Sequence, residues 1–472
     1  MTLTEKLKSL KNNEVIALSL LLFGQTMITN TVSTGVNILF TDVWKMTAWT
    51  TSFILLAAKI VEAVANPVAG YFVDRTHTKW GKCRPYILFA TPPLVLTTIL
   101  MFLPVSFGQT GDIVFLVGAF MVYTIANVLF YLPASGLMPL VFPDTTERTK
   151  AISYSSTLGS MGSILPSVLF FLIADLVAHG TGNDKAGYFV SAIAFTLPSA
   201  LLLFLTFNKI KEKVTIPAQK QNYRESIAFV FKNKPLILIM ISTIMMPLAN
   251  MTGSFIGYFS KWAYVDTINF GGVSNLAVLF PALSILSGLA YMLSMTLVPW
   301  LLKKMSKKQL FILSSLLGLV ANVAAWFIGF DNIFIFAAFR FFTNFPVGIA
   351  SVLLTSFTTE NIEFTQWKTG KRTEGATFAA KNMICSIFSA GTMVLPLMIL
   401  GAMHYNPDAM QAVVDSGAPL LSSEFGGIVK GIFFAMTVLS AVGYLLQLLP
   451  MLFYKFNDKE YAEAMEEIRA RQ

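Results

Sequence analysis

Charged residues are scarce in this sequence: Asp, Glu, Lys and Arg make up only 12% of its 472 residues. In soluble domains these four residue types make up roughly 25% of the sequence, because a folded surface must be hydrated. Two other residue types are also rare, since the chain holds two cysteines, Cys83 and Cys385, and three histidines. So few thiols and imidazoles indicate neither a disulfide framework nor a metal framework. The composition therefore excludes an ordinary soluble domain.

Long apolar runs are abundant instead. Hydrophobic residues make up 55% of the chain and the mean hydropathy is +0.66. Each run is long enough to cross roughly 30 Å of hydrocarbon as a helix, and its continuous character excludes a transmembrane β-barrel. We predict an all-α membrane protein with twelve spans, at approximately 15–40, 48–72, 85–106, 112–138, 151–177, 188–207, 235–262, 274–300, 309–330, 333–357, 375–400 and 428–453.

The basic residues lie in alternate loops. The less basic side holds only Lys45, Lys185, Lys261 and Lys430, and the last two lie at the ends of spans. Basic loops stay in the cytoplasm, so we expect both termini to be cytoplasmic in a multi-pass protein of the inner membrane. The net charge of +9 is thereby explained as topology-setting charge, and no nucleic-acid partner is expected.

The longest basic loop divides the chain. Residues 208–234 contain K-I-K-E-K and separate a bundle of six spans, 1–207, from a second, 235–453, which a charged tail, 454–472, follows. The basic loop after the second span has a counterpart after the eighth, Leu301–Gln309. Two matched halves are typical of a transporter built from repeats, whose site lies near the midplane between them.

The loop after the second span carries a motif. Gly70-x-x-x-Asp74-Arg75, followed by Gly81-Lys82-x-Arg84, resembles the signature loop of the major facilitator superfamily. The resemblance implies that Gly70, Asp74, Arg75 and Arg84 form a latch that holds one conformer closed. The alternative is that these charges only set the topology.

A finer resemblance covers the whole chain. Asn66-Pro67-x-x-Gly70, Trp80-Gly81-Lys82-x-Arg84-Pro85-Tyr86 and Lys368-Thr369-Gly370-Lys371-Arg372-x-Glu374-Gly375 are similar to stretches of the glycoside–pentoside–hexuronide:cation symporter family. The family implies a major-facilitator-type fold with two pseudo-symmetric six-helix halves and alternating access. It also adds Arg372 and Glu374 to the expected latch. The expected partners are a sugar or sugar acid, a coupling cation and membrane lipid, with a monomer as the oligomeric state and no cofactor.

Glu62 is the only acid in the middle of any predicted span, and Lys59 and Asn66 lie on the same helix. The family's cation site implies a second carboxylate where Asn66 stands and a hydroxyl where Val128 stands. A sodium site needs several hard oxygens with net negative charge, so we predict H⁺ rather than Na⁺ as the coupling ion. Alternatively, Glu62 forms a structural ion pair with Lys59, three residues earlier. The protein would then be an uncoupled facilitator or exchanger.

The sugar site is expected on several helices. The resemblance points to Gln25, Thr26, Tyr131, Ser135, Ser156, Lys381 and Asn382 as substrate-binding residues. Lys381 is a cation among positions that lack acids, which favours an acidic sugar, although it could instead extend to the membrane edge. Arg340 is similarly isolated in its span, and a structural role for it stays open.

Other classes of function fit poorly. The sequence has no P-loop, which argues against ATP-driven transport. Its predicted spans hold neither a histidine nor a pair of carboxylates, so we do not expect an enzyme.

Overall fold

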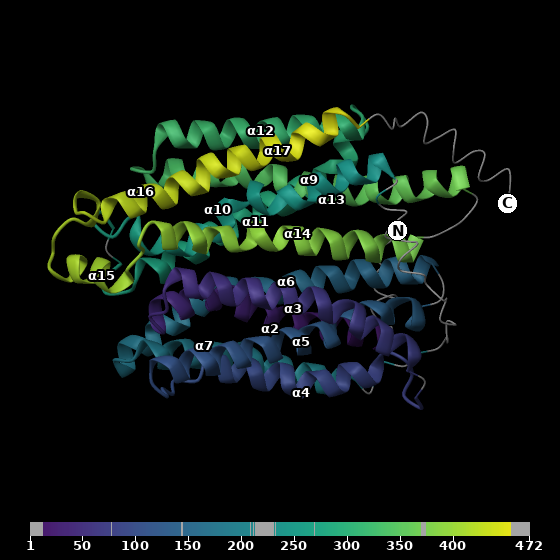
Figure 1. Ribbon diagram of the computed structural model, residues 1–472, viewed down its shortest axis with the longest axis horizontal. Helices are drawn as coiled ribbons and strands as arrows, with labels where there is room; N and C mark the ends of the chain where they lie inside the picture. The colour runs from purple at the N-terminus through teal and green to yellow at the C-terminus, as the bar shows by residue number, and fades with distance from the viewer. Residues whose placement is uncertain are drawn as a thin grey trace. The chain divides into compact units, whose positions relative to one another are not determined.

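The computed structural model describes residues 13–76, 78–142, 145–207, 209–210, 212, 231, 233–268, 270–369 and 374–454. Across these residues every regular element is a helix (Figure 1). Twelve helical segments of the described chain are long and apolar enough to cross a membrane. The prediction of an all-α protein with twelve spans is therefore confirmed. Most of the predicted linker and tail lies outside the described residues.

The helices form two compact units. The N-terminal unit comprises Met1–Gln219, Ile268–Pro281 and Asn406–Ala409, and the C-terminal unit comprises Lys220–Thr267, Ala282–Tyr405 and Met410–Gln472. The helices that begin in the N-terminal unit are α2 (Asn13–Ile38) with its π-helical end η1 (Leu39–Val43), α3 (Ala48–Arg75), α4 (Arg84–Met101), α5 (Gln109–Val141), α6 (Thr145–Thr181), α7 (Asp184–Phe207) and the first turns of α11 (Asn275–Leu301).

Within the N-terminal unit, α2 is the central helix. It packs against both α6 and α7, and α5 packs against α3 and α4. Glycine permits the closest of these approaches: a Cβ on Gly162 of α6 would lie 2.5 Å from the carbonyl oxygen of Phe23 on α2. Small residues let membrane helices approach this closely, and dispersion contacts then hold them together. The position of the polar groups on α2 is fixed by this packing.

The C-terminal unit holds the remaining helices: α9 (Lys234–Ala249), α10 (Met251–Trp262), the rest of α11, α12 (Lys307–Ile328), α13 (Ile333–Thr369), α14 (Glu374–Ala402), α15 (Pro407–Asp415) from its fourth residue, the 3₁₀ turn η2 (Leu420–Ser422), α16 (Gly426–Phe434), the π-helix η3 (Ala435–Leu439) and α17 (Ser440–Leu452). Its buried core is apolar, with Phe311 and Leu353 fully covered. Ser306 caps α12 through a capping box with Gln309.

The seventh span is interrupted. The helix α9 ends at Ala249, Asn250 adopts a non-helical conformation, and α10 begins at Met251. The hydroxyl of Thr252 donates to the carbonyl of Met436 in η3, at 2.7 Å. A Cβ on Gly443 would lie 2.3 Å from the backbone nitrogen of Ala249, so α17 touches the break directly. Irregular backbone at membrane depth is tolerated only where other protein groups cover it.

Candidate functional site

An ion pair lies on α3, inside a membrane span. The ammonium of Lys59 is 2.7 Å from the carboxylate of Glu62, and both side chains are about one-third exposed (36% and 34%). Their spacing of three residues brings the two side chains together on one face of the helix. Asn66 does not join the carboxylate: its amide donates to the backbone carbonyl of Glu62, at 2.9 Å. The described contacts therefore give Glu62 an ammonium partner.

A hydrogen-bonded polar cluster joins α2 and α5. The Gln25 amide donates to the Thr29 hydroxyl at 3.0 Å and to the Asn127 carbonyl oxygen at 3.4 Å. Tyr123 is buried one turn before Asn127, on the helix that packs against α3. The polar cluster and the charged pair on α3 thus belong to neighbouring helices. Neutral amides and hydroxyls at this depth can both donate to and accept from a sugar hydroxyl.

Thr29, Tyr123 and Asn127 were missed by the sequence analysis. A signal for them exists, because Gln25 and Thr29 are four residues apart on one helix, and so are Tyr123 and Asn127 on another. Residues four apart lie on the same face of a helix. Val128, singled out in their place, is buried at 4% exposure, and its neighbour Asn127 carries the polar group.

The residues of α5 that the sequence predicts to bind the sugar continue this face. Tyr131 and Ser135 follow Asn127 at intervals of four residues, and both are exposed. The Ser135 hydroxyl donates to the carbonyl of Leu132 in its own helix, at 2.7 Å. The helix α5 therefore presents polar side chains over four successive turns. Ser156 lies in α6, and its side chain is outside the described residues.

Thr26 lies in a different environment from Gln25. Its hydroxyl contacts three backbone carbonyls, including that of Gly159 on α6 at 2.8 Å. Residues 25 and 26 point about 100° apart around a helix, so one can face α5 while the other faces α6. The structure brings Thr26 into the packing contact between α2 and α6.

Lys381 is buried in the C-terminal unit, at 7% exposure. Its ammonium donates to the hydroxyl of Thr358 on α13, at 2.9 Å. Asn382 beside it is exposed. Nearby on α13, Glu360 accepts hydrogen bonds from Lys307 and Ser356. The partner described for Lys381 is thus a hydroxyl between packed helices.

Arg340 is also buried in the C-terminal unit, at 4% exposure. Two of its guanidinium nitrogens, Nε and Nη1, have no hydrogen-bond partner among the described atoms. Its charge lies close to Tyr444 of α17, whose hydroxyl donates to the carbonyl of Thr343 at 2.8 Å.

The motif loop of the N-terminal unit is organised around Glu212. Its carboxylate accepts from the backbone N–H groups of Lys82, Cys83 and Arg84, at 2.7, 2.8 and 3.0 Å. Gly81 has φ +105°, and a Cβ there would lie 2.3 Å from the Glu212 carboxyl carbon. A glycine is needed both for this conformation and for this contact. The sequence analysis did not single out Glu212.

The predicted latch residues have contacts within the same unit. The Arg84 guanidinium donates to the carbonyl of Phe207 at 3.1 Å and lies 4.7 Å from the centre of its ring. The Arg75 guanidinium lies 4.1 Å from the ring centre of Tyr71, and Gly70 is half-buried. The Asp74 and Glu374 side chains and all of Arg372 are outside the described residues. The latch between the halves therefore stays a prediction.

The sequence matches the family described as MFS/sugar transport protein across residues 19–458. An uncharacterized symporter, YnaJ, of Bacillus subtilis (strain 168) is 24% identical over 99% of this chain and 97% of its own. An isoprimeverose transporter of Lactiplantibacillus pentosus is 24% identical over 78% and 77%. A glucuronide carrier protein homolog of Escherichia coli (strain K12) is 23% identical over 91% and 89%.

The crystal structure of the nucleoside transporter NupG shares the fold. It superposes with a TM-score of 0.64 over 94% of this chain and 100% of that chain, at 12% sequence identity. These similar proteins are transporters rather than enzymes, which confirms the prediction that this protein is a transporter and not an enzyme. The major-facilitator-type architecture predicted from the motifs is confirmed as well. The chain therefore belongs to the MFS/sugar transport protein family and is a membrane transporter of the glycoside–pentoside–hexuronide group.

Proposed function

We propose that this transporter moves a glycoside, pentoside or hexuronide together with a proton across the cytoplasmic membrane. The observation that carries the proposal is the placement of the Glu62 ion pair on α3, which packs against α5, the helix that carries Asn127. Asn127 in turn accepts hydrogen bonds from Gln25 and Thr29 of α2. An ionisable group inside a membrane span is costly and usually belongs to an ion or substrate path.

The proton would act through the ion pair. When Glu62 is protonated, its carboxyl no longer attracts the Lys59 ammonium, and the carboxyl gains a donor. The amides of Gln25 and Asn127 would bind sugar hydroxyls, which have the same mixed donor and acceptor character. Sugar binding and protonation would then favour each other, because both act on side chains of the packed helices α3 and α5.

Proton coupling is supported over sodium coupling by the ligands near Glu62. The Asn66 side chain donates its NH2 group to its own helix backbone and offers a neutral oxygen where the family has a carboxylate, and Val128 offers no oxygen in its side chain. A hard cation such as Na⁺ requires several oxygen ligands. We place the basic loops and both termini on the cytoplasmic side, on the strength of the positive-inside rule.

The second candidate is an uncoupled facilitator or exchanger of the same sugars. The 2.7 Å contact between Lys59 and Glu62 favours it, because a permanent ion pair would not exchange its proton. The two candidates differ in one measurement. A thermal-shift screen of neutral sugars and sugar acids on the purified protein first identifies a ligand. Uptake of that ligand into proteoliposomes is then measured under an inwardly directed proton gradient, with the outside more acidic than the lumen.

Accumulation above equilibrium that a protonophore abolishes supports proton symport. Equilibration without accumulation, at a rate that the gradient leaves unchanged, would instead establish the facilitator.

A further inference from the structure

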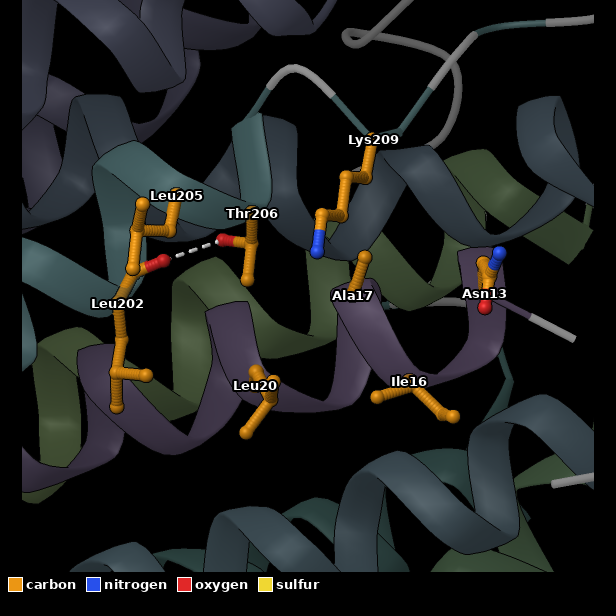
Figure 2. Close-up of a pocket in the computed structure, with 8 residues that line it drawn as sticks. All are labelled: Asn13, Ile16, Ala17, Leu20, Leu202, Leu205, Thr206 and Lys209. Carbon is orange, nitrogen blue, oxygen red and sulfur yellow. Dashed lines mark hydrogen bonds between the residues drawn. The ribbon is translucent and has the colours of Figure 1, made fainter. Parts of the chain in front are cut away.

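A groove of about 150 Å³ opens between the start of α2 and the end of α7 (Figure 2). Its lining comes from Asn13, Ile16, Ala17 and Leu20 on α2, from Leu202, Leu205 and Thr206 on α7, and from Lys209 just beyond the end of α7. Within each helix the residues follow intervals of three and four, so each helix contributes one continuous face. The groove lies within the N-terminal unit, at one end of two membrane spans.

The walls of the groove are apolar. Ala17 is buried at its floor, whereas Ile16 and Leu205 are 39% and 57% exposed. The one hydroxyl in the wall, that of Thr206, donates to the carbonyl of Leu202 at 2.7 Å (Figure 2). The apolar side chains of Ile16, Leu20, Leu202 and Leu205 suit a hydrocarbon chain, because a hydroxyl beside them would lack a partner.

The mouth of the groove is cationic. The exposed Lys209 side chain extends from the end of α7 toward Ala17, and the Asn13 amide lies at the first described turn of α2 (Figure 2). By the positive-inside rule this mouth is on the cytoplasmic side, where anionic lipid headgroups lie.

We propose that this groove binds an anionic phospholipid. Its phosphate would contact Lys209 and Asn13, and one acyl chain would lie along Leu20, Leu202 and Leu205. Basic pockets between membrane helices on the cytoplasmic side bind anionic headgroups in this way. A zwitterionic lipid has no net charge for the ammonium to attract. A free phosphate ion would gain nothing from the apolar walls.

The test measures lipid binding to the full chain by native mass spectrometry. The purified protein is titrated with a phosphatidylglycerol and, separately, with a phosphatidylcholine of the same acyl chains. We expect retention of phosphatidylglycerol to fall about fivefold in Lys209→Gln, the effect of one basic residue near the surface. Lys303→Gln is the matched control, since Lys303 is an exposed lysine of the C-terminal unit.

The apolar walls are tested separately. Leu205→Ser should lower phosphatidylglycerol retention, whereas Leu201→Ser should leave it unchanged. The two leucines are one turn apart on α7 and similarly exposed (57% and 60%), but only Leu205 lines the groove. Equal retention by wild type, Lys209→Gln and Leu205→Ser would overturn the proposal. Equal retention of both lipids, or displacement of phosphatidylglycerol by inorganic phosphate, would overturn it too.

Discussion

The Lys59 ammonium and the Glu62 carboxylate lie 2.7 Å apart on α3, which packs against α5. The contact with Lys59 stabilises the charged carboxylate. The packing of α3 against α5 places this ion pair on the helix next to Asn127, which accepts a hydrogen bond from Gln25 of α2. We propose that a change of protonation at Glu62 reaches the polar cluster through this helix contact.

Glu62→Gln should abolish uphill sugar uptake driven by a pH gradient while sparing sugar exchange. The amide keeps the shape of the carboxyl but cannot exchange a proton. Uptake and counterflow in proteoliposomes measure the two activities separately. Glu424→Gln is the matched control, because Glu424 is exposed in a loop of the C-terminal unit. Survival of uphill uptake in Glu62→Gln would show that another group carries the proton.

Sodium should not stimulate transport. Compared with the family's cation site, the neutral amide of Asn66 replaces a carboxylate and the apolar Val128 replaces a hydroxyl, so we expect too few charged or hard oxygen ligands for Na⁺. Uptake at fixed pH and ionic strength, with Na⁺ replaced by K⁺, measures this directly. A several-fold stimulation by Na⁺, accompanied by tighter sugar binding, contradicts the prediction.

Asn127→Ala should raise the KM for the sugar about tenfold, equivalent to about 1.4 kcal/mol. One hydrogen bond to substrate contributes about this much, and Gln25 loses an acceptor at the same time. Ile125→Ala on the same helix removes an exposed apolar side chain and should leave KM unchanged. If the two variants have the same KM, Asn127 does not contact the substrate.

Glu212→Gln should lower the thermal stability of the protein. The change removes the charge from hydrogen bonds to three backbone N–H groups, which we estimate at about 1–2 kcal/mol, or a few degrees in melting temperature. Gly81→Ala should destabilise the protein more. Its Cβ would clash with the Glu212 carboxyl group, and an alanine is strained at the positive φ of this position. A thermal unfolding assay with Glu424→Gln as control checks both. Unchanged melting of Glu212→Gln would mean that a neutral amide oxygen stabilises the loop as well as the carboxylate does.

Lys381→Gln separates two roles for this buried lysine. If it selects the charge of the substrate, the variant should bind an acidic sugar about tenfold more weakly and the neutral alcohol analogue equally well. We predict this pattern in a binding titration of the two ligands. Equal losses for both, with a lower melting temperature, would assign the Lys381–Thr358 contact to helix packing.

The spans were predictable because hydrophobic length alone decides them. The pairing of Lys59 with Glu62 was foreseen as an alternative, since an interval of three residues on one helix fixes the proximity of two side chains. The contact of Gln25 with Asn127 was not foreseen. It joins residues 102 positions apart, and its geometry depends on how α2 packs among its neighbours.

Glu212 shows a different limit of sequence reasoning. It is one acid among several lysines in a basic stretch, where it resembles ordinary solvated charge. Its function in the fold depends on the backbone conformation of Gly81, which exposes three successive N–H groups. Thr26 shows the opposite case. The sequence favours it as a substrate-binding residue beside Gln25, but its hydroxyl donates to backbone carbonyls of α6 and of its own helix.

The interruption at Asn250 has a mechanical consequence. It lies against Gly443, while Thr252 just beyond it bonds to the π-helix η3, so two irregular segments of the C-terminal unit meet at one depth. A regular helix resists bending through its continuous hydrogen bonds, and both helices lack that continuity here. We expect bending to concentrate at this level. The segments α10 and α16 would then tilt as a pair about Asn250 and η3, while α9 and α17 stay in place.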